Sequence, residues 1–139
     1  MHKEIFAKIT NYFSLRQEVV AVYIFGSYAA GKERLLSDID IALLIDPEKA
    51  GELNKLQTRY LVSLSKETRK DIDIVIMNTA GEELLKQIYE NGNCILVNNA
   101  DKLTVFNMVS FSKIADFAYY KNRMQAGVIR SIIGEPSIG

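Results

Sequence analysis

Two pairs of acidic residues stand at the start of apolar runs in this sequence. Asp38 and Asp40 are separated by one residue, as are Asp71 and Asp73. Because alternate side chains of a β-strand project from the same face, we expect the two carboxylates of each pair to lie side by side. Such carboxylates repel each other unless a cation neutralises them, and Mg²⁺ binds through a few carboxylates while it keeps positions for water and substrate phosphates. The spacing therefore predicts a magnesium site that Asp73 joins if the two strands are neighbours, whereas a solvated strand end explains Asp71 equally well.

A glycine and a serine precede the first acidic pair. Gly26 and Ser27 follow the apolar run VVAVYIF, and ten residues separate Ser27 from Asp38. Glycine lets the backbone adopt positive φ and come close to a ligand, while the serine hydroxyl and the backbone N–H groups can bond phosphate oxygens. The turn is therefore a candidate phosphate-binding site beside the carboxylates.

The connector between this turn and the acidic pair holds further candidates. Gly31 lies within it and Ser37 ends it, so both are candidate nucleotide-binding residues, Ser37 by orienting the entry to the strand. Lys32 and Arg34 lie close to Gly31 in the sequence, where they either face the outer phosphates of a nucleotide or belong to a solvated loop. The residue types alone do not decide between these two interpretations.

The composition excludes several classes of protein. The chain has 139 residues, which suits one domain with its own core, and its 17 basic residues balance its 17 acidic ones. Zero net charge argues against stable binding to nucleic acid, because such binding neutralises many phosphates with Lys and Arg. No apolar run approaches the ~20 residues that cross a bilayer, so no association with a membrane is expected. Cys94 is the single cysteine and His2 the single histidine, which excludes a disulfide framework and a histidine base and favours a reducing cytoplasm.

The hydrophobic spacing alternates between the helical period and continuous apolar runs. It predicts helices over residues 3–17, 48–69, 79–90 and 102–125, with Thr79 as an N-cap, and strands over 19–25, 38–45, 72–77 and 94–97. This order is typical of an α/β fold in which helices cover one central mixed sheet of about four strands. We expect the first three strands in the middle of the sheet, one domain over residues 1–126, and a flexible tail over 127–139.

The predicted C-terminal helix carries large apolar residues on more than one face. A helix that lies on one sheet needs only one apolar stripe, so some of these residues either complete the core or dock a partner. The residues concerned are Phe106, Val109, Phe111, Ile114, Phe117, Tyr120 and Met124.

The glycine turn and the carboxylates together resemble the signature of the polymerase-β-like nucleotidyltransferase superfamily. The likeness rests on Gly26-Ser27, the ten-residue gap, Asp38-Ile39-Asp40 and the later Asp73. Within the superfamily, the segments GSYAAGKERLLSDIDIALLI and DIDIVIMNTA are similar to minimal nucleotidyltransferase (MNT) domain antitoxins, which are paired with HEPN-domain toxins. The similarity covers residues 18–98 well and the last helix loosely, and it implies the nucleotidyltransferase fold with a C-terminal helix.

The resemblance implies a role for each acidic residue. Asp38 and Asp40 would bind two Mg²⁺ ions, and Asp73 would complete the metal site on the side of the attacking hydroxyl and accept its proton. Asp73 is preferred to Asp71 because the apolar run IVIMN after it matches the strand of the family. Gly26 and Ser27 would hold the triphosphate of ATP.

The resemblance also implies a reaction and a partner. The antitoxins that it points to transfer AMP from ATP to a tyrosine hydroxyl of a cognate HEPN ribonuclease toxin, with which they form a hetero-oligomer. Two alternatives remain: an antitoxin that neutralises its toxin by masking it without catalysis, and a nucleotidyltransferase for small molecules. The last is the weakest, because such enzymes usually carry an additional helical domain that 139 residues hardly permit.

Overall fold

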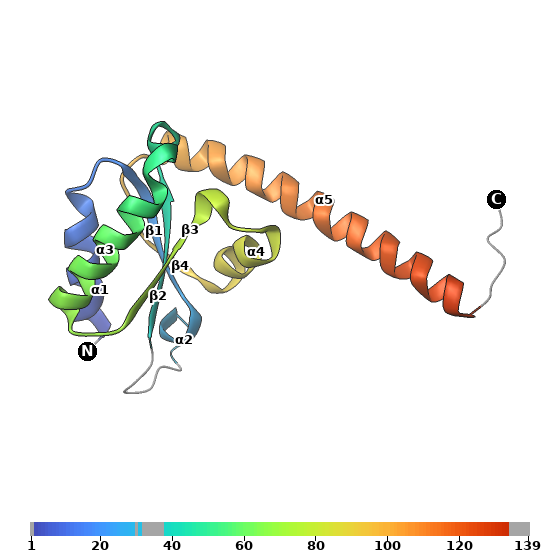
Figure 1. Cartoon of the computed structure of the whole chain (residues 1–139), viewed down its shortest axis with the longest axis horizontal. Helices are drawn as coiled ribbons and strands as arrows, with labels where there is room; N and C mark the ends of the chain where they lie inside the picture. Colours follow the sequence, from blue (N-terminus) through green and yellow to red (C-terminus); the bar gives the residue numbers. More distant parts are fainter. Residues whose placement is uncertain (1, 30, 32–37, 134–139) are drawn as a thin grey trace.

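Four strands form the central sheet of the protein, which we describe from a computed structural model for residues 2–29, 31 and 38–133 (Figure 1). The strands lie in the order β3-β2-β1-β4, with β1 antiparallel to β2 and β4 and with β2 parallel to β3. They are β1 (Val19–Phe25), β2 (Ile39–Ile45), β3 (Ile72–Ile76) and β4 (Asn93–Val97). The predicted mixed sheet of four strands is confirmed, and the two strands that follow acidic pairs are neighbours in it.

Helices cover both faces of this sheet. They are α1 (His2–Ser14), the short α2 (Gly26–Ala29), α3 (Leu53–Thr68), α4 (Glu82–Asn91) and α5 (Ala100–Ile133), with 3₁₀ turns η1 (Pro47–Glu52) and η2 (Met77–Thr79). Figure 1 shows α1 and α3 on one face and α4 and the start of α5 on the other. The fold is therefore a three-layer α/β sandwich, and its two faces bury separate cores.

The two cores follow from the alternation of side chains along the strands. On the α1/α3 face, Ile39 and Ile41 of β2 belong to the same buried cluster as Phe13 and Tyr60. On the α4/α5 face, Ala42 and Leu44 belong to a cluster with Met77, Leu85 and Ile88, against which Leu103, Phe106 and Ile114 of α5 pack. Residues of β2 therefore face the two layers in turn.

Two sequence predictions about β3 and α4 are wrong. Strand β3 lies at the edge of the sheet rather than in its middle, because its apolar character comes from Ile72, Ile74 and Ile76, which pack on the α1/α3 core and do not require a strand on each side. The Gln57 Nε2 of α3 donates to the Ile74 carbonyl oxygen at 2.5 Å and so occupies part of the open edge. Thr79 is not the N-cap of α4, since it lies in η2 and the helix begins at Glu82 after Gly81.

Asn98 joins three segments of the backbone just after β4. Its Nδ2 donates to the carbonyl oxygens of Phe13 at 3.0 Å, Arg16 at 3.2 Å and Val19 at 2.9 Å. Replacing Asn98 by Ala leaves these half-buried acceptors without this donor, so we expect the free energy of unfolding to fall by about 1–3 kcal/mol. Urea denaturation measures the loss, and Asn91→Ala, at an exposed position, serves as the control. Equal stabilities of the two variants would contradict this role of Asn98.

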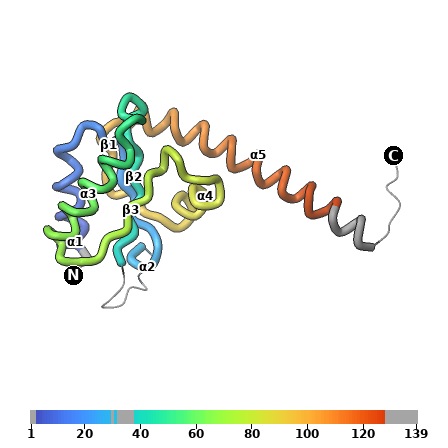
Figure 2. The backbone as a smooth tube through the Cα atoms, in the orientation of Figure 1, coloured from blue at the N-terminus to red at the C-terminus, as the bar shows by residue number. Residues whose placement is uncertain are grey.

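Helix α5 is longer than predicted and leaves the domain. It continues to Ile133, beyond the predicted end at residue 125 and into the segment predicted to be a flexible tail. Figure 2 shows the helix running away from the sheet after its first turns. The flexibility of residues 127–139 stays a prediction, and residues 134–139 lie outside those described. No helix within the described residues is long and apolar enough to cross a membrane.

Candidate functional site

The structure places Asp40 directly beside Asp73. These two residues are partners in the parallel register of β2 and β3, so their side chains project from the same face of the sheet. On its other side, Asp40 is paired with Phe25 in the antiparallel register of β1. Asp40 is half-buried and Asp73 is exposed, while Asp38 is exposed and immediately precedes β2. Two acidic residues distant in the sequence therefore meet at the start of two neighbouring strands.

Both carboxylates lie on the α4/α5 face of the sheet. Ile39 and Ile41 flank Asp40 in β2 and both enter the α1/α3 core, so Asp40 projects to the other side. In β3, Ile72 and Ile74 flank Asp73 in the same way. The strand alternation thus separates the acids from the core that holds the sheet together.

The three carboxylates interact through their charges. Burial raises the pKa of Asp40, and the negative charges of Asp73 and then Asp38 raise this pKa further. A raised pKa means that the ionised form of Asp40 is less stable in the folded protein than in water. A cation placed among these groups would offset their repulsion and stabilise the ionised form of Asp40.

The donors fit Mg²⁺ in their chemistry, since they are carboxylate oxygens from two neighbouring strands beside open solvent. In the part of the chain that the structure describes, however, no three acidic, histidine or cysteine side chains are grouped so as to hold a metal ion. Asp38 and Asp73 are exposed, and exposed side chains change rotamer within nanoseconds. Their carboxylates can therefore turn toward Asp40 without any movement of the core.

Gly26 brings the backbone against Asp40. Its φ is +71°, a conformation that favours glycine, and a Cβ at this position would overlap the Asp40 Oδ2 and lie 3.1 Å from the Asp40 Cγ. Ser27, the second residue of α2, is half-buried beside it. The turn that the sequence predicts to bind phosphate therefore adjoins the carboxylate that it is predicted to serve.

Tyr28 is a residue of this turn that the sequence analysis missed. Its side chain is buried in the α1/α3 core and so holds the four-residue helix α2 at the end of the sheet. The signal was the one aromatic residue of the connector SYAAGKERLL. Tyr28 positions Gly26 and Ser27 through the backbone.

The other sequence candidates differ in what the structure says of them. Gly31 has a φ of +68°, and among the described residues no atom lies within 4 Å of a Cβ built on it. Ser37 lies outside the described residues, as do Lys32 and Arg34. Asp71 is exposed, and its carbonyl oxygen accepts a bond of 2.9 Å from the Ile39 N–H, which is part of the sheet.

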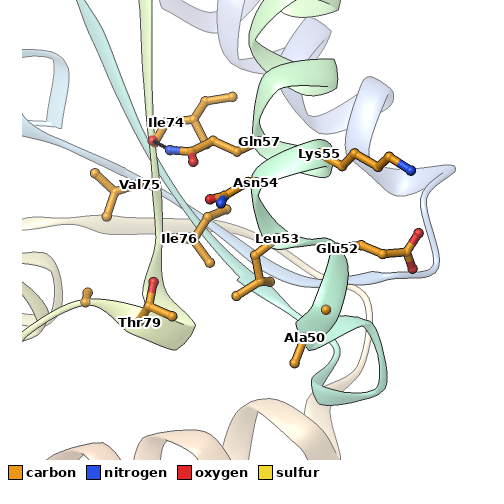
Figure 3. Close-up of a pocket in the computed structure, with 12 residues that line it drawn as sticks. Ala50, Glu52, Leu53, Asn54, Lys55, Gln57, Ile74, Val75, Ile76 and Thr79 are labelled. Atoms are coloured by element: carbon orange, nitrogen blue, oxygen red, sulfur yellow. Dashed lines mark hydrogen bonds between the residues drawn. The ribbon is translucent and has the colours of Figure 1, made fainter.

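A cavity of about 710 Å³ lies apart from the carboxylates, between the start of α3 and the outer edge of β3 (Figure 3). Asn54 and Gln57 of α3 project toward β3 there, and the rest of the lining comes from residues 50–53, 55, 74–76 and 79–80. None of the three carboxylates lines it. The carboxylate site is therefore separate from this cavity.

The raised pKa of Asp40 has a consequence for stability that can be measured. The folded protein binds the Asp40 proton more tightly than the unfolded chain, so the Asp40 contribution to stability grows as the pH falls through the folded pKa and is complete below the unfolded pKa. Other acids lose stability over the same range, so the useful quantity is the difference between the parent and Asp40→Asn. We expect the advantage of Asp40→Asn in urea denaturation without metal to shrink from pH 7 toward pH 4, a window chosen around ~3.9 for an unfolded Asp. An advantage that does not change with pH would show that burial and repulsion do not act on this carboxyl.

The chain is similar to several solved structures. A chain from a structure of tri-AMPylated Shewanella oneidensis HEPN toxin in complex with MNT antitoxin is 20% identical with a TM-score of 0.62, covering 96% of this chain and 99% of that one. A chain from a mutant of the toxin–antitoxin pair MntA-HpeT is 21% identical with a TM-score of 0.67, covering 92% and 98%. A chain from a toxin–antitoxin structure with AMP-PNP is 22% identical with a TM-score of 0.64, covering 91% and 98%. At these identities the likeness shows the fold.

A comparison with curated proteins finds no match. The comparison with protein families does: residues 7–101 match the family described as polymerase beta, nucleotidyltransferase. This range includes the turn at Gly26 and the carboxylates Asp38, Asp40 and Asp73. The chain belongs to the polymerase beta nucleotidyltransferase family.

Proposed function

We propose that this protein is an antitoxin-type adenylyltransferase that transfers AMP from ATP to a tyrosine hydroxyl of a cognate HEPN ribonuclease toxin. The observation that carries the proposal is the register of Asp40 and Asp73 on neighbouring strands beside the backbone of Gly26. The match of residues 7–101 to a nucleotidyltransferase family supports the reaction class. The toxin partner rests on the sequence resemblance and on solved structures of similar fold.

The proposed reaction exchanges one bond at phosphorus. The tyrosine oxygen bonds to the α-phosphorus of ATP, the bond from this phosphorus to the bridging oxygen breaks, and pyrophosphate leaves. The proton of the phenol passes to the carboxylate of Asp73. Asp38, Asp40 and Asp73 would hold two Mg²⁺ ions, which when bound stabilise the negative charge on the triphosphate and lower the pKa of the attacking hydroxyl.

The residues of the turn hold the other end of the nucleotide in this proposal. Because Gly26 has no side chain, the backbone of the turn lies directly against the Asp40 carboxylate, which brings a phosphate held by the turn close to the metal site. Ser27 offers its hydroxyl and its N–H to the phosphates, with Gly31 and Ser37 as further candidates from the connector. The exposure of Asp38 and Asp73 suits an acceptor that another protein presents.

Intact-mass measurement of the partner tests the proposal. The protein encoded by the adjacent gene, which the proposal expects to be a HEPN protein, is incubated with this protein, ATP and Mg²⁺, and the expected result is one or more AMP increments on it. Asp71→Asn, which removes an exposed neighbouring carboxylate, is expected to behave like the parent, while Asp40→Asn gives no increment. A partner whose mass does not change with the parent protein would refute the proposed activity.

The exposed apolar residues of α5 favour a second candidate, neutralisation by binding alone. Phe111, Phe117 and Tyr120 are 52%, 40% and 64% exposed, which is typical of a surface that a partner covers. A variant with both Asp40→Asn and Asp73→Asn separates the two functions in cells that express the toxin. Growth equal to that with the parent would establish masking, and loss of protection supports catalysis.

A further inference from the structure

The outer part of α5 has no partner within the described chain. Every described residue from 115 to 127 is exposed, although the helix there carries aromatic and other apolar side chains. Phe117 is 40%, Tyr120 64% and Met124 72% exposed. A monomeric protein seldom leaves a continuous apolar surface in water, so a covered state of this segment is expected.

The exposed side chains continue an apolar stripe of α5 whose first part packs on the core of the domain. Leu103, Phe106 and Ile114 pack against the core on the α4/α5 face. At 3.6 residues per turn, Phe117 and Met124 lie on the same side of the helix as these residues, and Tyr120 lies at the edge of that side. The stripe thus passes from the domain into solvent with its apolar character unchanged.

A groove lies where the stripe leaves the domain. It has a volume of about 300 Å³ between α4 and α5, with Ile114, Phe117 and Ala118 as its apolar residues on α5. The groove also holds Glu82, Glu83 and Glu90 with Lys86 and Lys121. The Lys121 Nζ of α5 donates to the Glu83 Oε1 at 2.9 Å, and Lys86 pairs with Glu90 at 4.0 Å, both at exposed positions. The groove therefore has apolar residues on α5 and a small excess of negative charge on α4, where Glu82 is the glutamate outside these two pairs.

The groove and the carboxylates lie on the same face of the sheet. Helices α4 and α5 cover the face from which Asp40 and Asp73 project. A protein seated along the groove and the outer part of α5 would therefore lie on the side of the catalytic acids rather than behind them.

We propose that the outer part of α5, defined by Phe117, Tyr120 and Met124, docks an amphipathic helix of the acceptor protein in the groove beside α4. The inference rests on the proposed function, whose acceptor is a protein. The apolar residues of the acceptor helix cover the stripe, and a basic residue of that helix faces Glu82 of α4. The excess negative charge of the groove disfavours an anionic membrane surface, because both are negative. The docking helix gives the acceptor its position, and the carboxylates carry out the transfer.

Calorimetric titration of the cognate HEPN protein into the full chain tests the docking. The double variant Phe117→Ser, Met124→Ser changes only exposed side chains, so its circular dichroism and melting temperature are expected to match those of the parent. Its affinity for the HEPN protein is expected to fall roughly 30-fold or more, as for residues at the centre of an interface. The KM for the acceptor rises while kcat at saturating acceptor stays close to that of the parent.

Met108→Ser is the matched control. Met108 is 67% exposed, about as much as Met124, but it lies on the opposite side of α5 from the stripe. It is expected to bind the HEPN protein with parental affinity. Equal affinities of the double variant and the parent would overturn the docking site, as would an equal loss in Met108→Ser.

Three further outcomes identify the occupant and separate this inference from the proposed function. Sedimentation shows whether the protein alone forms a dimer. A dimer that the double variant Phe117→Ser, Met124→Ser abolishes would overturn the inference, because a second copy would then occupy the stripe. Binding that depends on Phe117 and Met124 without AMP transfer would support the docking site and refute the activity. Transfer with unchanged KM in the double variant would support the activity and refute the docking site.

Discussion

Replacing Asp40 by Asn is expected to lower the rate of AMP transfer by about 10³-fold or more, because metal ions supply several kcal/mol of transition-state stabilisation and about 1.4 kcal/mol is worth tenfold in rate. The same variant is expected to unfold at the same or a higher temperature in the absence of metal. Burial and the charges of Asp73 and Asp38 raise the pKa of Asp40, so the neutral Asn removes an unfavourable charge. Activity and stability should therefore change in opposite directions, as at other sites where function stores unfavourable charge.

Initial rates of labelled AMP incorporation and thermal melts measure the two effects. Asp71→Asn is the control, since Asp71 is also acidic, exposed and at the start of β3 but contributes its backbone to the sheet. An Asp40→Asn variant with parental activity would remove Asp40 from the proposed catalytic group. A large fall in melting temperature would show that Asp40 stabilises the fold instead.

Replacing Gly26 by Ala is expected to be nearly as damaging to activity through a different cause. The positive φ of Gly26 costs about 1–2 kcal/mol for any other residue, and the new Cβ would also overlap the Asp40 Oδ2. The Asp40 carboxylate must move, and a displacement near 1 Å at a reacting group can cost about 10²-fold in rate. Both the free energy of unfolding and the transfer rate should fall.

Gly31→Ala separates the two causes. Gly31 has a φ of +68°, close to the +71° of Gly26, but no atom of the described residues lies within 4 Å of a Cβ built on it. Its substitution should therefore show the backbone cost alone, about 1–2 kcal/mol in urea denaturation. If Gly26→Ala lowers the free energy of unfolding no more than Gly31→Ala does, the overlap with Asp40 is not the cause of the damage.

Periodicity predicts the order of the elements because the strands are short, mostly apolar runs and the helices repeat apolar residues at helical spacing. The boundaries of β2 differ from the predicted range by one residue, since Asp38 precedes the first ladder position at Ile39. The position of β3 at the edge of the sheet escapes such reasoning. Its isoleucines indicate one face that packs on the core, and they do not indicate how many strands lie beside it.

The alternation of side chains along the strands allowed part of the candidate site to be predicted. That Asp40 and Asp73 share a face follows from spacing once β2 and β3 are neighbours. The sequence could not show why glycine is needed at position 26. The reason is the close approach of Asp40 from the neighbouring strand β2, which only the fold reveals. The metal-binding and nucleotide-binding roles of these residues stay predictions.

The sequence left open whether the apolar residues of the last helix are core or interface. Phe106 and Ile114 pack on the core, while Val109, Phe111, Phe117, Tyr120 and Met124 are exposed. The helical period is the same in both parts of α5, so only the place where the helix leaves the sheet decides the outcome. The point at which α5 leaves the sheet depends on the lengths of α4 and of the strands that α5 covers.

A crystal structure with Mn²⁺ and a nonhydrolysable ATP analogue tests the central claim most directly, because Mn²⁺ is located by its anomalous scattering. We predict ions bound by the carboxylates of Asp38, Asp40 and Asp73 together, with the triphosphate against the backbone of Gly26 and Ser27. Ions bound elsewhere, or held by Asp38 and Asp40 while Asp73 stays turned away from them, would contradict it.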